Sequence, residues 1–391
     1  MASLRLFLST ALATPALTQT LYATSYNDHA LTTLQLDGSS LKTVSKSYDC
    51  GSEPTWLTLD SANSVLYCLN EGWGGNSTIT SYQTGAAGAL TTLDILPTLK
   101  SPVASTLYGP KNANLAVAYY DTSSFGTVSV NNPKDLAQTL LETYTLAAPG
   151  PVPDRQDAPH LHDAILDPTR KFIIVPDLGS DLLRIYRIGA TNVTQLPPVK
   201  ALPGSGPRHG AFAVVGRKTF FYNVNELSNN ITGYSVSYTR NTLEFTRLFD
   251  FSTHGPGGSV PAGTKAAEIV VSPDNRFVIL SSRGENNLTF PNPAPTNGTD
   301  AELVSDPLVS FSIGGRTGQL TLLQITAAGG RNPRGFSLNK AGTLLASALQ
   351  DDNRVVVIER DVKTGLLGKV VASATVGEGD GNGPNYALFY E

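Results

Sequence analysis

Cysteine, methionine, tryptophan and charged residues are all scarce in this chain. Its 391 residues include two cysteines, one methionine and two tryptophans, and only 15% are charged. The formal net charge is −4, and no basic stripe with interleaved aromatic residues occurs. A nucleic acid is therefore a poor partner, because binding to a phosphate backbone needs clustered positive charge. No apolar run approaches the roughly 18 residues of a membrane-spanning helix, so no membrane partner is expected.

Several motifs of familiar enzyme classes are also missing from the sequence. It has no G-x-S-x-G nucleophile elbow, no H-E-x-x-H zinc motif and no C-x-x-C. His160 and His162 would share one face of a strand, but no third metal ligand is evident. The glycine-rich segments at 204–206 and 255–258 lack a following helix that would hold a phosphate. We therefore expect neither a metal nor another cofactor.

The cysteines, the N-terminus and several sequons all indicate the secretory pathway. Cys50 and Cys68 would pair in an oxidising compartment, and two buried thiols are the alternative. A single positive charge at Arg5, an apolar segment and small residues predict a signal peptide over 1–18, where a disordered or strand-forming end is the alternative. Five N-x-S/T sequons support secretion and predict glycosylation at Asn76, Asn192, Asn230, Asn287 and Asn297.

A short sequence motif that recurs along the chain, here called the repeat motif, is the most informative pattern present. Its copies begin at 54, 101, 158, 206, 266, 332 and 383, a mean spacing of about 55 residues that suits four-stranded propeller blades with long loops. Each full copy precedes an apolar run, a turn cluster and a second apolar run that ends in polar residues. The clearest copies are Pro159-His160-Leu161-His162, Gly206-Pro207-Arg208-His209, Ala266-Ala267-Glu268-Ile269 and Asn332-Pro333-Arg334-Gly335.

Each repeat has the pattern of short strands. Residues 171–175 and 276–280 are apolar runs bounded by turn residues, and no stretch shows a sustained helical periodicity. Six full repeats begin between residues 54 and 332, and the seventh needs both ends of the chain. Residues 383–391 would supply its first strand and residues 21–36 its later strands. The sequence therefore predicts an all-β protein, a seven-bladed propeller of four-stranded antiparallel blades that forms one domain over 20–391.

Polar residues recur at equivalent strand ends of successive repeats, where propeller strands face the central channel. The first strands supply His160, His162, Arg208, His209, Glu268 and Arg334, and the second strands end in Asp177, Asn225, Glu226, Arg283 and Gln350. Arginines suit a carboxylate or phosphate, and a histidine can act as an acid or a base. Structural alternatives are ion pairs that join adjacent blades, histidines that only donate hydrogen bonds, and turn stabilisation by Asp177 and Asp181.

In the copies of the repeat motif the sequence resembles the lactonase propeller family, and the resemblance extends from about residue 20 onward. That family includes bacterial 6-phosphogluconolactonases and the fungal 3-carboxy-cis,cis-muconate lactonizing enzyme. The resemblance implies catalytic roles for His160, Arg208, Glu226 and Arg283. Two departures, the ending Ala348-Leu349-Gln350-Asp351-Asp352 and the signs of secretion, argue against a phosphorylated sugar lactone as the substrate.

The resulting hypothesis is an enzyme that forms or hydrolyses a lactone of a small carboxylate-bearing molecule, in the manner of a carboxymuconate cyclase. Two arginines would clamp carboxylates, His160 would be the general acid or base, and Glu226 would orient it or an arginine. The expected substrate-binding residues are His162, His209, Asn225, Glu268 and Arg334. Alternatives are an isomerase or cyclase of secondary metabolism and a secreted glycoprotein without catalysis. Convergence of these side chains on one cavity separates the enzymes from the last alternative.

Overall fold

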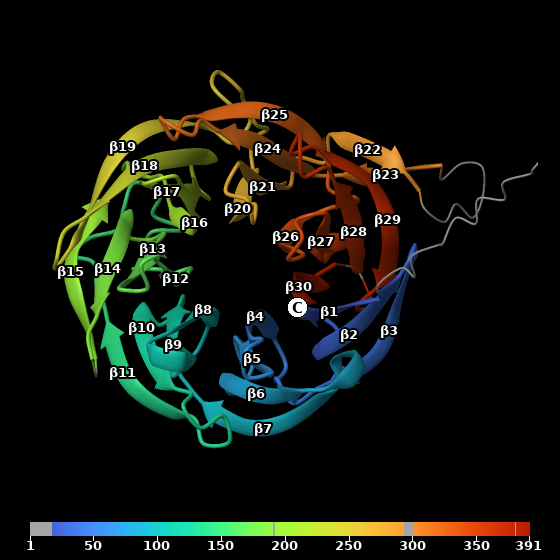
Figure 1. Ribbon diagram of the computed structural model, residues 1–391, viewed down its shortest axis with the longest axis horizontal. Coiled ribbons are helices and arrows are strands. Elements are labelled where there is room, and N and C mark those ends of the chain that lie inside the picture. The colour runs from blue at the N-terminus through green and yellow to red at the C-terminus, as the bar shows by residue number, and fades with distance from the viewer. Residues whose placement is uncertain (1–17, 191, 293–300, 380) are drawn as a thin grey trace, which may run out of the picture.

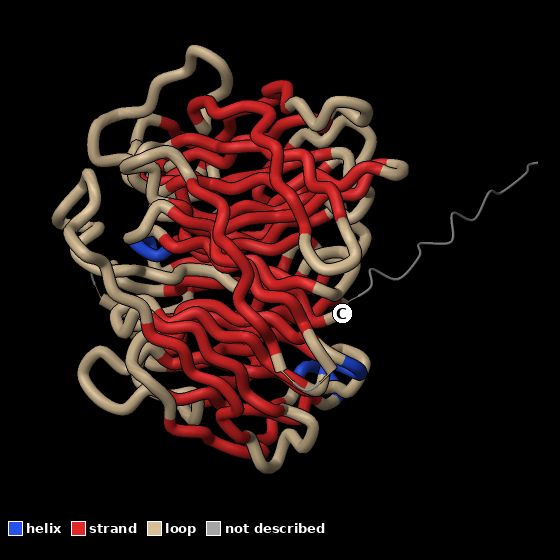
Figure 2. The backbone as a smooth tube through the Cα atoms, turned by 90° about the vertical axis from the view of Figure 1, so that its left-hand side faces the viewer, coloured by secondary structure: helices blue, strands red, loops and turns tan. Residues whose placement is uncertain are grey.

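Seven four-stranded antiparallel sheets stand around a central axis in the computed structural model, which describes residues 18–190, 192–292, 301–379 and 381–391 (Figure 1). Seen from the side, strands make up most of the ring and loops gather at its ends (Figure 2). The predicted all-β propeller of seven blades is therefore confirmed. The signal-peptide prediction falls almost entirely outside the described residues, and the sequon at Asn297 lies wholly outside them.

Six blades follow one another along the chain, each beginning at its innermost strand. Blade 1 contains β4 (Pro54–Asp60), β5 (Val65–Asn70), β6 (Thr78–Thr84) and β7 (Leu90–Pro97). Blade 2 contains β8 (Pro102–Tyr108), β9 (Asn114–Tyr119), β10 (Ser124–Ser129) and β11 (Ala137–Thr143). Blade 3 contains β12 (Ile165–Leu166), β13 (Phe172–Asp177), β14 (Leu182–Ile188) and β15 (Val193–Lys200).

The second half of the chain repeats this order. Blade 4 contains β16 (Pro207–Val215), β17 (Lys218–Asn225), β18 (Asn230–Tyr238) and β19 (Leu243–Ser252). Blade 5 contains β20 (Lys265–Val271), β21 (Phe277–Arg283), β24 (Pro307–Ile313) and β25 (Leu320–Ala327), with a hairpin of β22 (Leu288–Pro291) and β23 (Glu302–Ser305) inserted. Blade 6 contains β26 (Pro333–Leu338), β27 (Leu344–Leu349), β28 (Arg354–Arg360) and β29 (Leu367–Thr375).

Blade 7 joins the two ends of the chain. Its innermost strand is β30 (Pro384–Tyr390), which pairs antiparallel with β1 (Gln19–Ser25), followed outward by β2 (Ala30–Asp37) and β3 (Ser40–Ser47). The predicted closure by strands from both ends is thus confirmed. Closure in this way pairs strands that would otherwise be free sheet edges.

Helix is confined to short turns in the described part of the chain. These are three 3-10 segments, η1 (Ala86–Gly88), η2 (Pro110–Asn112) and η3 (Gln350–Asp352). Among the described residues, no helix is long and apolar enough to cross a membrane.

One hydrophobic cluster fills each interface between neighbouring blades. Between blades 1 and 2, for example, Val65 and Leu69 pack with Val117 and Tyr119. Both faces of an inner strand are therefore buried, which explains why apolar runs such as 172–175 show no alternation of polar residues.

A β-bulge recurs near the start of the innermost strands. The register shifts after the first paired residue in β4, β8, β16, β26 and β30, and after the second in β20. In β12 the regular pairing is itself short, and an isolated bridge joins Leu161 to Asp177. A bulge leaves a residue unpaired and turns its side chain. As a result, neighbours such as Arg208 and His209 both reach the channel, although successive residues of a regular strand point to opposite faces.

The structure joins Cys50 and Cys68 in a disulfide, with 5.8 Å between their Cα atoms. Cys50 follows β3 of blade 7 and Cys68 lies in β5 of blade 1, so the bond links the blade that closes the ring to its neighbour. Both residues are fully buried.

Replacing both cysteines by alanine should lower the free energy of unfolding by about 3 kcal/mol, because the bond closes a loop of 18 residues in the unfolded chain. Denaturant unfolding of the variant and of the wild-type protein, with and without reductant, measures the difference. Reduced wild type should approach the variant. A variant as stable as the oxidised wild type would contradict a stabilising role for the bond.

Candidate functional site

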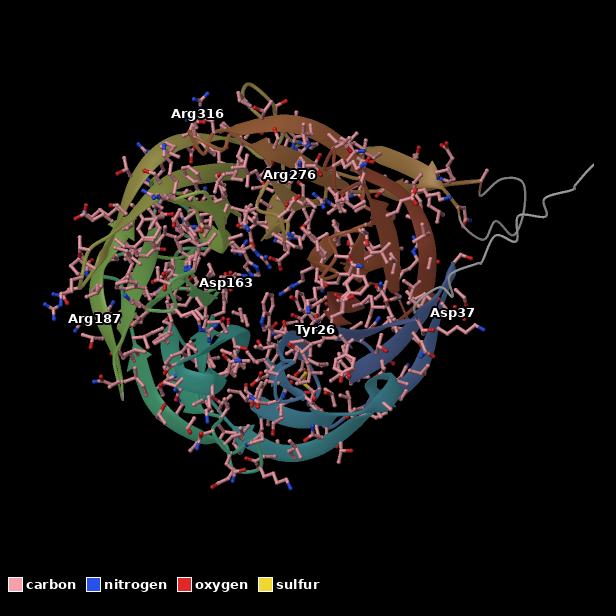
Figure 3. All side chains as sticks on the ribbon, in the orientation of Figure 1. Tyr26, Asp37, Asp163, Arg187, Arg276 and Arg316 are labelled. Carbon is pink, nitrogen blue, oxygen red and sulfur yellow. A yellow bond between two sulfur atoms is a disulfide. The ribbon has the colours of Figure 1, made fainter. Side chains whose placement is uncertain are left out.

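A polar cavity of about 380 Å³, here called the inner cavity, lies at the end of the ring where the innermost strands begin. It is formed by starts of first strands, ends of second strands and adjoining loops. Its lining consists of Glu71, Trp73, Val103, Tyr120, Asp121, Arg155, His162, Arg208, Glu226, Lys265, Arg283 and Arg334. In Figure 3, Tyr26 and Asp163 lie toward the centre of the ring, whereas Arg187 and Arg316 lie on its rim.

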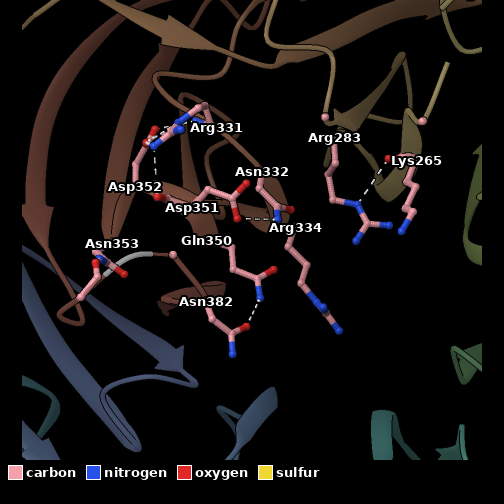
Figure 4. Close-up of a pocket in the computed structure, with 14 residues that line it drawn as sticks. Lys265, Arg283, Arg331, Asn332, Arg334, Gln350, Asp351, Asp352, Asn353 and Asn382 are labelled. Atoms are coloured by element: carbon pink, nitrogen blue, oxygen red, sulfur yellow. Dashed lines mark hydrogen bonds and ion pairs between the residues drawn. The ribbon is translucent and has the colours of Figure 1, made fainter. Parts of the chain in front are cut away.

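A wider hollow of about 990 Å³, here called the vestibule, adjoins the inner cavity. Lys265, Arg283 and Arg334 line both spaces. Gln350 also lines the vestibule, where its side-chain amide donates a hydrogen bond to Asn382 at 2.8 Å (Figure 4). Three cationic side chains thus stand where the vestibule meets the inner cavity.

Glu226 holds together the arginines of the inner cavity. Its Oε1 accepts from Arg155 at 2.6 Å, and its Oε2 accepts from Arg208 and from Arg283, each at 2.9 Å. The carboxylate is only 4% exposed. Burial alone would raise the pKa of Glu226, but the three guanidinium groups hold it well below its usual range. Glu226 is therefore a carboxylate at neutral pH, and it fixes the positions of arginines from different segments.

Positive charge exceeds negative charge around the inner cavity. The cationic residues in its lining are Arg155, Arg208, Lys265, Arg283 and Arg334, whereas the acidic ones are Glu71, Asp121 and Glu226. Five cations against three carboxylates leave an excess of two positive charges. An anionic ligand would offset this excess.

Of the four arginines in the lining, Arg334 is the least engaged with protein groups. It is the bulge residue of β26 and lines both the inner cavity and the vestibule. Its nearest carboxylate oxygen is that of Glu71, 3.8 Å away, and its guanidinium lies over the ring of Tyr26 at 5.3 Å. Glu71 itself accepts hydrogen bonds from Tyr26 and from Trp73. In Figure 4 the side chain of Arg334 extends away from the hydrogen-bonded pair of Asn332 and Asp351. Because it lines both spaces, it is in a position to meet a ligand in either.

The two histidines of the motif Pro159-His160-Leu161-His162 occupy different places. His160 stacks on Tyr120 with ring centroids 4.3 Å apart, its Nδ1 lies 3.2 Å from the Tyr120 carbonyl oxygen, and its Nε2 lies 3.0 Å from Asp157. Both ring nitrogens of His160 therefore face acceptors. By contrast, His162 lines the inner cavity. The structure does not bring His160, the predicted acid or base, into that lining, because the broken pairing before β12 turns the second histidine inward.

Beneath the inner cavity, His162 begins a row of three buried polar side chains. Its Nδ1 lies 3.2 Å from Nε2 of His209, and Nδ1 of His209 lies 3.0 Å from Oε1 of Glu268. All three residues are less than 9% exposed. Burial, reinforced by the charge of Arg208, lowers the pKa of His162 well below its ordinary value and that of His209 to about 3. His209 and Glu268, which were expected to bind substrate, are absent from the lining of the inner cavity and continue the row below His162.

Asn225 does not join the other predicted residues. Its side-chain amide donates to Thr232 and its oxygen accepts from Asn223, so the group is satisfied within blade 4. Asp177 accepts from the main-chain N–H of His160 and of Ser180. These bonds match the expected structural alternative for Asp177.

Some residues that line the inner cavity lie outside the repeat motif. Arg155 belongs to a loop and Lys265 begins β20, whereas Tyr120 follows β9 at the position that Glu226 has after β17. Glu71 was within reach of sequence reasoning, because Leu69-Asn70-Glu71 in blade 1 matches Val224-Asn225-Glu226 in blade 4. Comparing equivalent corners of all the repeats would have identified Glu71 as a candidate.

Glu226→Gln should lower the free energy of unfolding by about 3–5 kcal/mol at pH 7, because it leaves buried guanidinium groups without their counter-charge. Since the pKa of Glu226 is lowered in the folded state, the wild type's advantage is complete above the usual carboxyl pKa and should shrink below about pH 4. Denaturant titrations over this pH range measure both effects.

The matched control is Asp274→Asn, which breaks the exposed pair of Asp274 with Arg276. It should cost less than about 1 kcal/mol, as exposed ion pairs contribute little. Equal losses in the two variants would show that the charge of Glu226 has no special structural weight.

Comparisons with known proteins agree with this architecture. Residues 20–380 match the model of the family described as "Lactonase, 7-bladed beta-propeller". A relative from Arthroderma benhamiae, named as a probable 6-phosphogluconolactonase, is 32% identical over 345 residues, which cover 87% of this chain and 82% of the relative. The 6-phosphogluconolactonase of Bacillus subtilis is 24% identical over 83% of this chain and 84% of its own length.

Among solved structures, the periplasmic gluconolactonase of Pseudomonas aeruginosa superposes with a TM-score of 0.78 at 24% identity, covering 96% of this chain and 99% of that one. At this identity the likeness shows a shared fold. The family match covers most of the chain and the first relative exceeds 30% identity, in accord with the predicted lactonase-type enzyme. The chain therefore belongs to the lactonase family of seven-bladed β-propellers.

Proposed function

We propose that this protein hydrolyses a lactone that carries an anionic substituent, with His162 as the general base. The observation that carries the proposal is the inner cavity, where the His162 imidazole stands among cations that exceed the carboxylates by two. An uncharged base beside unneutralised guanidinium groups suits the addition of water to a carbonyl group whose oxygen becomes negative.

The order of residues along the cavity suggests how such a substrate lies. Arg334 lines both spaces, whereas His162 belongs to the inner cavity alone of the two. Lys265 and Arg283 stand at the vestibule side. We place the lactone carbonyl between His162 and Arg334, and the anionic substituent toward Lys265. The substrate then enters with its negative charge directed to cations that the protein does not fully neutralise.

Hydrolysis would follow from the protein's own side chains. Nε2 of His162 takes a proton from water, and the hydroxide oxygen bonds to the lactone carbonyl carbon. Arg334, whose nearest carboxylate oxygen is 3.8 Å away, stabilises the negative oxygen of the tetrahedral intermediate. When the ring C–O bond breaks, the protonated His162 returns its proton to the departing alkoxide oxygen. The product is an open-chain hydroxy acid.

Substrate charge would also adjust the base. Burial and the nearby charge of Arg208 lower the pKa of His162, which weakens it as a proton acceptor. An anion in the cavity opposes the effect of the arginines and raises that pKa toward neutrality. A neutral lactone would not supply this correction, so an anionic substituent should assist catalysis as well as binding.

The names of the relatives favour hydrolysis over lactone formation, because they denote lactonases. The carboxymuconate-type hypothesis asks for the same groups in a different reaction, in which a substrate carboxylate oxygen adds to a C=C bond and the neighbouring carbon takes up a proton. Convergence of His162, Arg208, Glu226 and Arg283 on one cavity argues against a binding protein without catalysis. A carboxylate and a phosphate are both compatible with the cationic lining, and substrate comparison separates them.

Secretion is part of the same proposal. The buried disulfide suits an oxidising compartment. Asn76, Asn192 and Asn287 are exposed and accessible to a glycan. Asn230 is not: it is partly buried in β18 and its side-chain amide donates to Asp250 at 2.6 Å. We therefore retain glycosylation for the three exposed asparagines and withdraw it for Asn230.

A lactone panel tests the activity. It should contain a neutral aldonolactone, its phosphorylated form and carboxylate-bearing muconolactones, assayed in both directions. His162→Gln should reduce kcat by about 10²–10³-fold, as expected for loss of a general base. Lys265→Met should raise KM about tenfold for anionic lactones, a loss of about 1.4 kcal/mol, and leave the neutral one unchanged.

The matched control for the base is His160→Gln. An equal loss of kcat in this variant would return the role to His160, and full activity of His162→Gln would overturn the assignment to His162. If no lactone is hydrolysed or formed by the wild-type protein, the proposed activity is wrong.

Expression through a secretory host tests the glycosylation sites. Peptide mass spectrometry after glycosidase treatment in heavy-oxygen water should find modified Asn76, Asn192 and Asn287, because these residues are exposed. Asn230 should be unmodified and serves as the internal control. A glycan on Asn230 would contradict the structural argument, and an unmodified secreted protein would contradict the proposal for the three exposed sites.

A further inference from the structure

We propose that His209 and Glu268 are positioning residues that hold His162 as its Nδ1–H tautomer and thereby keep the Nε2 lone pair turned toward the inner cavity. This inference deepens the proposed function, since it rests on His162 as the general base. It concerns residues that the sequence had suggested for substrate binding, and it gives them a role that requires no contact with substrate.

The three side chains come from three consecutive blades. His162 precedes β12 of blade 3, His209 lies in β16 of blade 4, and Glu268 lies in β20 of blade 5. The bulges in β16 and β20 give His209 and Glu268 their places on the channel side. Their hydrogen-bonding atoms form one uninterrupted row, with separations of 3.2 Å and 3.0 Å.

The direction of donation along the row is set at its inner end. The main-chain N–H of Ile269, which can only donate, lies 3.0 Å from Oε1 of Glu268. This oxygen therefore accepts from Ile269, and we infer that it is a carbonyl-type acceptor to which Nδ1 of His209 also donates. In a neutral His209 the other nitrogen, Nε2, then accepts, so Nδ1 of His162 must donate. The proton of His162 is thus on Nδ1, and its Nε2 bears the lone pair.

The charge state of the row supports this pattern. Burial lowers the pKa of both imidazoles and raises that of Glu268 to about 8. Each imidazole therefore carries a single N–H at neutral pH. In the inferred pattern the proton of a neutral Glu268 lies on Oε2, which leaves Oε1 to accept from both His209 and Ile269.

The surroundings leave little freedom to the row. Glu268 is anchored by its main-chain N–H, which donates to Ser281 at 3.0 Å. Trp56 meets the His209 ring edge-on at 5.5 Å between centroids, and Tyr120 meets the His162 ring in the same way at 5.4 Å. Within the described residues, Oε2 of Glu268 is buried without a hydrogen-bond partner. Such a costly arrangement is typical of functional rather than structural polar groups.

Nε2 of His162 is the atom left for chemistry. No described residue bonds to this nitrogen, and its ring lines the inner cavity. General-base catalysis contributes about 10²–10⁴-fold to a rate, and the wrong tautomer would present an N–H where a lone pair is needed. The positioning residues should therefore affect kcat strongly and substrate binding little.

Two variants of His209 separate positioning from packing. His209→Phe keeps an aromatic ring but can neither donate nor accept, and it should reduce kcat about 100-fold with KM changed less than about threefold. His209→Gln offers an amide N–H to Glu268 and a carbonyl oxygen to His162, so it should recover part of this loss. Equal kcat values for His209→Phe and wild type would overturn the proposal.

The histidine tautomers can also be measured by NMR spectroscopy, which needs no substrate. The chain has only five histidines, so selective ¹⁵N labelling of histidine and long-range ¹⁵N–¹H correlation can assign each tautomer at neutral pH. His162 and His209 should both be Nδ1–H in the wild type, and His162 should lose this preference in His209→Phe. An Nε2–H tautomer for His162 in the wild type would overturn the inference.

Glu268 provides a second pair of variants if His209→Phe does not fold. Glu268→Gln keeps an acceptor for Ile269 and His209 and should preserve both tautomers, whereas Glu268→Met removes it and should release them. Unchanged tautomers in Glu268→Met would overturn the proposal. If the lactone panel shows no turnover, the proposed function fails on its own, and the spectra still decide whether the row fixes His162.

Discussion

Pairing of β30 with β1 closes the ring, and the candidate site depends on that closure. An open array of seven sheets would leave the starts of its innermost strands far apart. A closed ring brings them around one axis, where residues from positions as distant as 71 and 334 meet across a few ångströms. The hydrophobic clusters between blades then hold each sheet at a fixed angle to the next. Side chains on different blades therefore keep fixed separations, although they are far apart in the sequence.

Convergence alone would place only alternate residues of each inner strand toward the axis. The recurring β-bulge changes this, because two neighbours on the bulged strand oppose one residue on its partner. Arg208 can therefore contribute to the arginine cluster while His209 contributes to the polar row beneath it. The same distortion makes Arg334 available to the cavity while Gly335 packs against the deeper channel. One backbone irregularity, repeated around the ring, thus builds two functional layers from a single strand position.

The repeat was sufficient to predict the blade number, the four-stranded sheets and the closing blade, since spacing and apolar runs report directly on strands and turns. It also identified Arg208, Glu226 and Arg283, which do meet. The repeat could not show which of His160 and His162 lines the inner cavity, because regular strand geometry puts both on one face. Only the broken pairing at Leu161 separates them. Asn225 was misplaced for a related reason: a strand-end position does not reveal that Thr232 and Asn223 satisfy its amide. Arg155 belongs to no repeat, and its ion pair with Glu226 spans 71 residues of sequence.

Electrostatics links the arginine cluster to the histidine row. Glu226 binds three guanidinium groups but carries one negative charge, so the cluster remains cationic after its internal ion pairs have formed. That remaining charge, together with burial, suppresses protonation of His162 and keeps the row neutral. As a consequence, the lowered pKa makes His162 a weak base. In the proposed function, an anionic ligand would oppose this suppression when it binds, because its charge would offset that of the arginines and raise the pKa of His162. Recognition of charge and activation of His162 would then be one physical event, which explains why a single cavity combines uncommitted cations with a buried, oriented imidazole.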